Sequence, residues 1–298
     1  MAPSRDLQLD AARGLAVLLV LSGHLLQPVF YGPSGPEPGP ALAVWRVIYA
    51  FHMPFFFLLC GMVDRMKGEM DLAAACASAL KLVVVALTFS TLALIPRALD
   101  GTLSAADALR DALYGQTFGL GVLWFLVVLG LVRVIDAAAR AAAFPGGYWI
   151  VLGGVLALSW ICSARAFPYW QVHALVGALP FYVAGLRLGR RAFDVSALLG
   201  ACGLAVLLLC APRNFVHVAT GQYGDPALFA VSAVAGSAFM LAAARPPRGP
   251  PRAPAGGLGG GRRRCAPSRG PPLPPRGAPH RPAWDRWHLL ALLVVLGL

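Results

Sequence analysis

The chain has 298 residues, of which 58% are hydrophobic and 13% are charged, and its formal net charge at pH 7 is +12. Soluble domains average about 45–50% apolar and about 25% charged residues, so this composition excludes a water-soluble domain and indicates a membrane protein. Residues 1–244 carry 15 basic and 12 acidic side chains, a net of +3, whereas residues 245–298 carry 10 arginines and one aspartate, a net of +9. The main part is therefore nearly neutral, and the composition gives no reason to expect a nucleic-acid partner.

Eight apolar stretches approach the length of about 17–25 residues that a transmembrane helix needs. In chain order they are Leu9–Val29, Ala43–Val63, Leu72–Leu94, Leu120–Ile135, Tyr148–Ser163, Val172–Leu188, Val195–Ala211 and Ala227–Ala244. They predict an all-α, polytopic bundle of transmembrane helices. With the N-terminus in the cytoplasm, nine loop or helix-end basic residues fall on the cytoplasmic side and four on the other. Because basic residues concentrate in the cytoplasm, we expect this orientation, in the inner (plasma) membrane.

The first stretch contains three ionisable residues, Asp10, Arg13 and His24. Arg13 and His24 are eleven positions apart, which places them about 20° apart around a helix and about 16 Å apart along it. Asp10 precedes Arg13 by three positions and can pair with it. The arginine suits an anionic donor molecule, and the histidine suits proton transfer or carriage of an acyl group. Alternatively, Arg13 extends to the membrane interface and His24 makes a hydrogen bond between helices.

The second stretch contains His52 two residues before Pro54, within Phe51-His52-Met53-Pro54. Pro54 cannot donate a helical hydrogen bond, so we expect irregular backbone one turn earlier. Such backbone at membrane depth lines a protein-buried or wet cavity, or else marks a packing kink with a hydrogen-bonded histidine. Lys81 in the third stretch either faces a cavity, pairs with an acidic group or extends to the interface. His173 and His217 lie at predicted span ends, where we expect solvated side chains without a role.

Four sequence stretches resemble the integral-membrane acyltransferase family 3, especially its sugar O-acetylase branch. They are Leu9–Gly14 with Ser22–His24, then Ile48–Leu58, Leu123–Leu126 and Leu179–Gly185. The first two are specific, and the resemblance covers roughly residues 5–244. It departs from the family pattern at Cys60, where a serine is usual, and in the few basic residues that follow the second stretch.

The resemblance implies transfer of an acyl group, usually acetyl, from acyl-CoA to a hydroxyl of a saccharide or other acceptor. It implies that Arg13, His24 and His52 are catalytic. Arg13 and the remaining basic residues Arg65, Lys67 and Lys81 would bind the acyl-CoA. The implied partners are the glycan-type acceptor, acyl-CoA as a co-substrate and the lipid bilayer, with no permanently bound cofactor. The six cysteines form no CxxC pair and have no histidine at ligand spacing, so no metal site is expected.

The C-terminal part does not follow the family pattern, which continues with two further spans. Residues 245–286 hold 12 prolines and 10 arginines, a composition that predicts disorder. Residues 287–298 are apolar again, but they are too short to span a bilayer. We therefore divide the chain into an acyltransferase domain (1–244), a Pro/Arg/Gly-rich segment (245–286) and a short remnant of a span (287–298). The composition switch after Ala244 is typical of a GC-rich gene read out of frame, although a basic arm that contacts anionic lipid would have the same charge.

Two other functions fit parts of the same sequence. A transporter or flippase for a saccharide or proton-coupled solute would also use histidines within its spans. Transporters commonly contain internal repeats, and neither histidine motif occurs twice here. The second alternative is an acyltransferase that the altered C-terminal part has inactivated.

Overall fold

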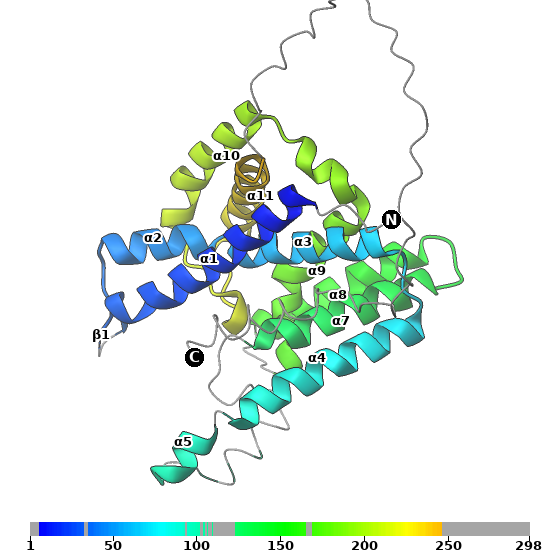
Figure 1. Cartoon of the computed structure of the whole chain (residues 1–298), viewed down its shortest axis with the longest axis horizontal. Helices are drawn as coiled ribbons and strands as arrows, with labels where there is room; N and C mark the ends of the chain where they lie inside the picture. Colours follow the sequence, from blue (N-terminus) through cyan, green and yellow to red (C-terminus); the bar gives the residue numbers. More distant parts are fainter. Residues whose placement is uncertain are drawn as a thin grey trace, which may run out of the picture. The chain divides into compact units, whose positions relative to one another are not determined.

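The computed structural model describes residues 6–32, 35–92, 94–101, 104, 106, 109, 123–164 and 169–245. In these residues the regular structure is helical apart from one isolated bridge and a short antiparallel pair of strands, β1 (Tyr31–Gly32) and β2 (Gly35–Pro36) (Figure 1). The predicted segment 245–286 lies outside the described residues except for Arg245, and the remnant 287–298 lies outside them entirely.

Each of the eight predicted spans overlaps a helical segment, although residues 120–122 of the fourth lie outside the described residues. The α-helices are α1 (Leu7–Phe30), α2 (Pro40–Tyr49), α3 (His52–Lys67), α4 (Leu72–Leu92), α5 (Leu94–Leu99), α7 (Trp124–Arg140), α8 (Gly147–Ala164), α9 (Leu175–Leu188), α10 (Ala197–Cys210) and α11 (Pro226–Ala243). Short 3-10 turns are η1 (Tyr169–Ala174), η2 (Gly189–Asp194), η3 (Ala211–Arg213) and η4 (Val218–Thr220). Among the described residues, six helical stretches are long and apolar enough to cross a membrane, while α7 and the stretch Ala197–Arg213 are shorter. The prediction of an all-α transmembrane bundle is confirmed.

The second predicted span is broken where the proline motif indicated. Helix α2 ends at Tyr49 and α3 begins at His52, and Phe51 between them has a non-helical backbone (φ −140°, ψ −20°). Pro54 is the third residue of α3 and has no N–H, so the carbonyl of Ala50 cannot receive its usual helical hydrogen bond. Because of this break, His52 lies in the first turn of α3 rather than in the middle of one continuous helix.

Helix α3 is the centre of the packing, because α1, α9 and α11 all contact it. The α3–α9 crossing is the closest, and two glycines make it possible. A Cβ on Gly61 would lie 2.1 Å from the carbonyl oxygen of Tyr182, and a Cβ on Gly185 would lie 2.1 Å from that of Leu58. The two helix backbones therefore touch directly at this point.

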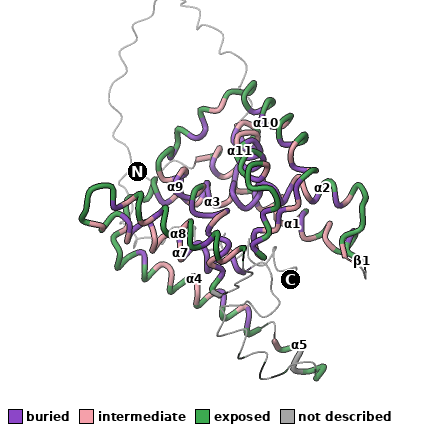
Figure 2. The backbone as a smooth tube through the Cα atoms, turned by 180° about the vertical axis from the view of Figure 1, so that it is seen from behind, coloured by how far each residue is buried: buried purple, intermediate pink, exposed green. Residues whose placement is uncertain are grey.

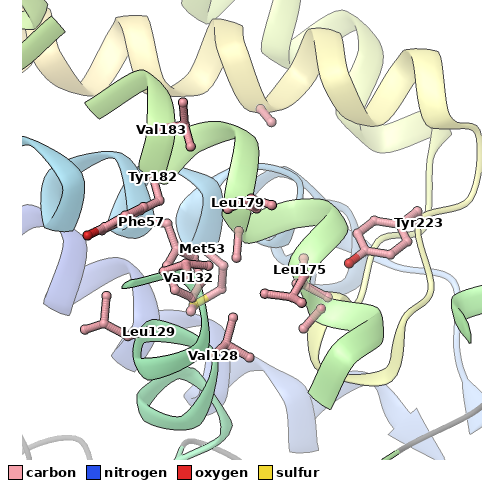
Figure 3. Packing of buried hydrophobic residues seen from close by; sticks show 14 of the residues in the cluster. Met53, Phe57, Val128, Leu129, Val132, Leu175, Leu179, Tyr182, Val183 and Tyr223 are labelled. Atoms are coloured by element: carbon pink, nitrogen blue, oxygen red, sulfur yellow. The ribbon is translucent and has the colours of Figure 1, made fainter. Parts of the chain in front are cut away.

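A cluster of buried apolar side chains extends from this crossing to α7. Met53 and Phe57 of α3 pack with Leu179 and Tyr182 of α9, and Val128 of α7 closes the cluster (Figure 3). In contrast, α4 and α10 are exposed over much of their surface (Figure 2). Their exposed residues are largely aliphatic, among them Leu80, Val84, Leu198 and Leu209. Such surfaces are stable against lipid tails rather than water.

Candidate active site

Three histidines from separate segments meet around Tyr49. The rings of His52 of α3 and of His217, in the loop between η3 and η4, lie 4.6 and 5.5 Å from the Tyr49 ring, and His24 of α1 follows Gly23, which packs against the same ring. His24 and His217 are half-buried, whereas His52 is only 5% exposed. The structure therefore brings together His24 and His52, which the sequence singled out, and adds His217 to them. We call the region around these rings the His end of the bundle.

The tautomer of His52 follows from its hydrogen bond. Its Nδ1 atom lies 2.9 Å from the carbonyl oxygen of Ile48. A carbonyl can only accept, so Nδ1 carries a hydrogen and Nε2 carries the lone pair of the neutral ring. The ring also packs 4.6 Å from the ring of Tyr49, measured between centroids. His52 is thus held in one orientation with its outer nitrogen unprotonated.

His217 is fixed in a similar way by its own loop. Its backbone exchanges two hydrogen bonds with Gln222, of 2.7 and 3.1 Å. The hydroxyl of Thr220 lies 3.1 Å from both the carbonyl oxygen and the Nδ1 atom of His217. Burial lowers the pKa of His217 from its ordinary value of 6.5, and the charge of His24 lowers it further. The ring is therefore held neutral in near-neutral water.

The loop that carries His217 is braced by side chains on both of its flanks. Asn214 donates to the carbonyl of Tyr223 (3.1 Å) and accepts from the amide of Asp225 (2.9 Å). The Tyr223 hydroxyl donates to the carbonyl of His173 (2.8 Å), and the His173 ring bonds the carbonyl of Ala219 (2.9 Å). Our expectation of solvated histidines here was wrong, because His173 is 5% exposed and His217 is half-buried.

Aromatic rings form one wall of the His end. Trp45 stacks on Tyr49 at 3.8 Å between centroids and lies 5.2 Å from both Phe30 and Phe215. The His217 ring stacks on Trp45 at 5.9 Å. These contacts join α1, α2 and the η3–η4 loop beside the histidines.

Arg13 lies eleven residues before His24 on α1, toward the other end of the bundle. Its guanidinium is 3.8 Å from the carboxylate of Asp10, as predicted, and both side chains are partly exposed. Asp6, at the start of the same helix, pairs with Arg190 of η2 at 3.1 Å. The N-terminal turn of α1 therefore lies beside the end of α9.

A pocket opens where α3, α7, α8 and α9 meet, at the opposite end of α3 from His52. Charged residues dominate its lining: Asp64, Arg65, Glu69, Asp136, Arg140 and Arg187. We call this region the Arg-rich end. Because α3 has 16 residues, its two ends lie about 24 Å apart.

One wall of this pocket is a buried ion pair. Arg133 of α7 donates two hydrogen bonds to Asp64 of α3, at 2.7 and 3.0 Å, and a third to Ser78 of α4 at 2.9 Å. The hydroxyl of Tyr182 on α9 donates to the same carboxylate at 3.0 Å. Asp64 is 4% exposed and the Arg133 side chain 14%, so four helices share one buried polar contact.

The other wall carries two arginines with different surroundings. Arg140 pairs with Asp136 at 3.0 Å and with Glu69 at 3.8 Å. The guanidinium of Arg187 lies 4.9 Å above the ring of Tyr148, and within the described part of the chain it makes no ion pair. Arg187 is therefore the cation of this pocket that is best placed to meet an incoming anion.

The basic residues proposed from the sequence divide into two groups. Arg65 lines the pocket and pairs with Glu69 at 3.5 Å. Lys67 and Lys81 are exposed and are not part of the lining. In the described residues no group of three His, Cys, Asp or Glu side chains is arranged to hold a metal ion.

The fold and these two ends define a polytopic membrane protein with a charged pocket and a separate group of histidines. Comparison with known proteins identifies its family. The acyltransferase domain of acyltransferase family 3 matches residues 6–255, and the chain therefore belongs to that family. With six helical stretches long and apolar enough to cross a membrane among its described residues, it is a membrane-protein member of that family.

Two curated relatives match a shorter stretch. Nodulation protein NolL of Mesorhizobium japonicum is 40% identical over 58 residues, which are 20% of this chain and 15% of the relative. Nodulation protein NolL of Sinorhizobium fredii is 37% identical over 60 residues, 20% of this chain and 16% of the relative. The matched stretch thus spans less than a fifth of each relative, and no solved structure matches the chain.

Proposed function

We propose that this acyltransferase moves an acetyl group from cytoplasmic acyl-CoA to a hydroxyl of a saccharide acceptor on the opposite side of the membrane. The observation that carries the proposal is the meeting of His24, His52 and His217 at one end of a bundle whose other end is lined by arginines. Anion binding and proton transfer are the two requirements of acyl transfer from a phosphorylated thioester.

The Arg-rich end supports the choice of donor. Acyl-CoA carries phosphate groups, and a guanidinium binds phosphate through paired hydrogen bonds. Arg187 has no carboxylate partner in the described structure, and Arg65 is 56% exposed. Both can bind a phosphate without first breaking a buried ion pair. Arg13, near the N-terminal end of α1, would help to position the acyl-CoA.

The His end supports a neutral hydroxyl acceptor. Its wall consists of aromatic rings, on which the apolar face of a sugar ring can pack. The imidazoles provide nitrogen lone pairs that can accept the proton of a hydroxyl. His24 would act as the base or as the acyl carrier, and His52 would support the cavity with its fixed tautomer.

The orientation of the chain follows from the same assignment. If acyl-CoA binds at the Arg-rich end, this end faces the cytoplasm, together with the N-terminal turn of α1. This agrees with the distribution of basic residues along the sequence. The location we propose is the inner membrane, with the acceptor presented on its outer side.

The test is acyl transfer by the full chain in liposomes, with labelled acetyl-CoA and a saccharide acceptor. We expect label in the acceptor, and a loss of about 100-fold or more in the variants His24→Ala and Arg13→Ala. The variant Thr88→Ala, on the exposed face of α4, serves as the control. Movement of a solute without acyl-CoA would favour a transporter instead. If the folded wild-type protein transfers no label, the proposal is wrong for this chain.

A further inference from the structure

The three clustered histidines differ in the hydrogen bonds of their rings and in the exposure of those rings. Within the described residues His24 has no hydrogen-bond partner. His52 is anchored through Nδ1 but is almost fully buried. His217 is anchored through Nδ1 and remains half-buried. It is therefore the histidine of this group that combines a fixed ring with access to a ligand.

A general base benefits from such an anchor. When Nδ1 donates to an oxygen, the lone pair of the neutral ring is confined to Nε2 and points in one direction. At His217 the hydroxyl of Thr220 donates to the backbone carbonyl, so its oxygen is available to accept from Nδ1–H. The partner is a neutral hydroxyl rather than a carboxylate, which leaves the ring uncharged and ready to accept a proton.

The surroundings of His217 resemble those of a positioned functional group. Tyr223, Asn214 and His173 hold the loop through hydrogen bonds to its backbone, and Ser163 of α8 donates to Gly221. A site whose ring orientation matters requires this kind of supporting shell. The ring itself faces Trp45 and Tyr49, on the aromatic wall.

We propose that His217 is the general base that takes the proton of the acceptor hydroxyl, while His24 carries the acyl group between donor and acceptor. This inference rests on the proposed function and names the residue that serves the acceptor. It assigns to two different residues the roles of base and acyl carrier, which are alternatives for His24 when the sequence is considered alone.

The reaction then has two balanced steps. In the first, a nitrogen of His24 attacks the thioester carbonyl and the carbon–sulfur bond breaks. The thiolate leaves and takes the ring proton of His24, which gives CoA thiol and a neutral acyl-imidazole. In the second, the acceptor oxygen attacks the acyl carbon and its proton moves to Nε2 of His217. The acyl–nitrogen bond breaks, and the imidazolate of His24 recovers the proton from His217.

The two steps can be measured separately in the full chain. Exchange of labelled CoA into acetyl-CoA, without acceptor, reports the first step, and label transfer to the saccharide requires both. For His217→Ala we expect exchange within twofold of wild type and transfer reduced about 100-fold or more. Added imidazole should restore part of the transfer. His24→Ala should lose both reactions.

A matched pair of variants tests the anchor without removing the ring. Thr220→Val removes the oxygen that accepts from Nδ1, and we expect transfer to fall about tenfold. Thr220→Ser keeps the oxygen and should retain most of the rate. Both proteins should elute as monodisperse species, with melting temperatures within about 4 °C of wild type.

Several outcomes would overturn the inference. One is a rate of transfer by His217→Ala within threefold of wild type. Another is the loss of both exchange and transfer in His217→Ala, which would indicate a structural role for His217. A wild-type protein that transfers without any exchange would exclude the acyl-histidine step. These results leave the proposed function intact, whereas a folded wild-type protein with neither reaction would overturn both.

Discussion

The two ends of the bundle manage polar groups in opposite ways. At the Arg-rich end, cations and carboxylates are paired within and between helices, as in Arg133 with Asp64 and Arg140 with Asp136. At the His end, the imidazoles of His52 and His217 bond to a backbone carbonyl and a hydroxyl, and their neighbours are aromatic. Charged pairs dominate one end, whereas the other consists mainly of neutral groups, although the Arg46 guanidinium lies there, 5.9 Å from the Phe215 ring and 2.9 Å from the carbonyl oxygen of Pro212.

This difference matters because full charges are costly away from water unless they are paired. Paired arginines can remain charged next to the membrane, while Arg187, which makes no ion pair among the described residues, is left to bind an anion. Histidines surrounded by carbonyls, hydroxyls and rings remain neutral, which a proton acceptor must be. The separation of about 24 Å along α3 keeps the carboxylates of the Arg-rich pocket away from the rings, where they would favour the charged imidazolium.

Removal of the buried carboxylate should have the largest effect on stability. Asp64→Ala leaves Arg133 with an unpaired buried charge, which typically costs about 3–5 kcal/mol. We expect this variant to lose most of its monodisperse fraction on mild heating in detergent. Asp64→Leu combined with Arg133→Met removes both charges and should recover most of the loss. If the single variant is as stable as wild type, Asp64 does not hold the four helices together.

The corresponding change at the His end should be far milder. Thr220→Val removes one neutral hydrogen bond, which is worth about 1 kcal/mol. The same heating assay therefore compares the two ends directly. Equal losses of stability in Asp64→Ala and Thr220→Val would show that the two ends do not differ in this way.

The next prediction concerns the crossing that joins the two ends. Gly185→Ala places a methyl group 2.1 Å from the carbonyl oxygen of Leu58, so α3 and α9 must move apart. Overpacking of this kind costs about 1–3 kcal/mol. Gly153→Ala is the matched control, since a Cβ on that α8 glycine meets nothing within 4 Å. A melting temperature for Gly185→Ala that equals the control would show that the crossing can relax.

Much of the fold follows from hydropathy. The predicted span Leu9–Val29 became α1 (Leu7–Phe30), and Ala227–Ala244 became α11 (Pro226–Ala243). The break before His52 was also predictable, because a proline inside an apolar run leaves one carbonyl without its donor. Helix lengths and the effects of proline depend on neighbouring residues, so they can be predicted from the sequence.

The site was only partly predictable. His24 and His52 were detectable as ionisable groups inside spans. Asp64 follows the predicted second span by one residue and Arg133 lies inside the fourth, so the sequence did not single out this pair. His217 gave no such signal, because its position at a span end predicts solvent contact. Its burial depends on the packing of the 214–225 loop against α2 and α9, which is tertiary structure.

A smaller effect is expected on donor binding. Arg187→Ala removes the pocket cation that makes no ion pair among the described residues, and we expect KM for acetyl-CoA to rise about tenfold, as for loss of one charged hydrogen bond. The kcat at saturating donor should change little. Arg213→Ala removes an exposed cation of η3 that is not part of this pocket lining, and it serves as the control. A rise in KM for the acceptor, with none for acetyl-CoA, would assign this pocket to the acceptor.

The smallest effect is a pH dependence that originates at the His end. Burial lowers the pKa of His217 from 6.5, so below pH 6.5 the unfolded chain binds this proton more readily than the folded one. Stability from this group is therefore complete above pH 6.5 and falls as the pH drops toward the lowered pKa, at no more than roughly 1.4 kcal/mol per pH unit because a single proton is involved. The titratable groups that face the ring are His24 of α1, Tyr49 of α2 and His52 of α3. Comparison with His217→Gln in the same buffers isolates the contribution of this one ring. Identical acid sensitivity in the two proteins would show that His217 is free to charge, and a freely charging ring would not remain available as a base in acidic surroundings.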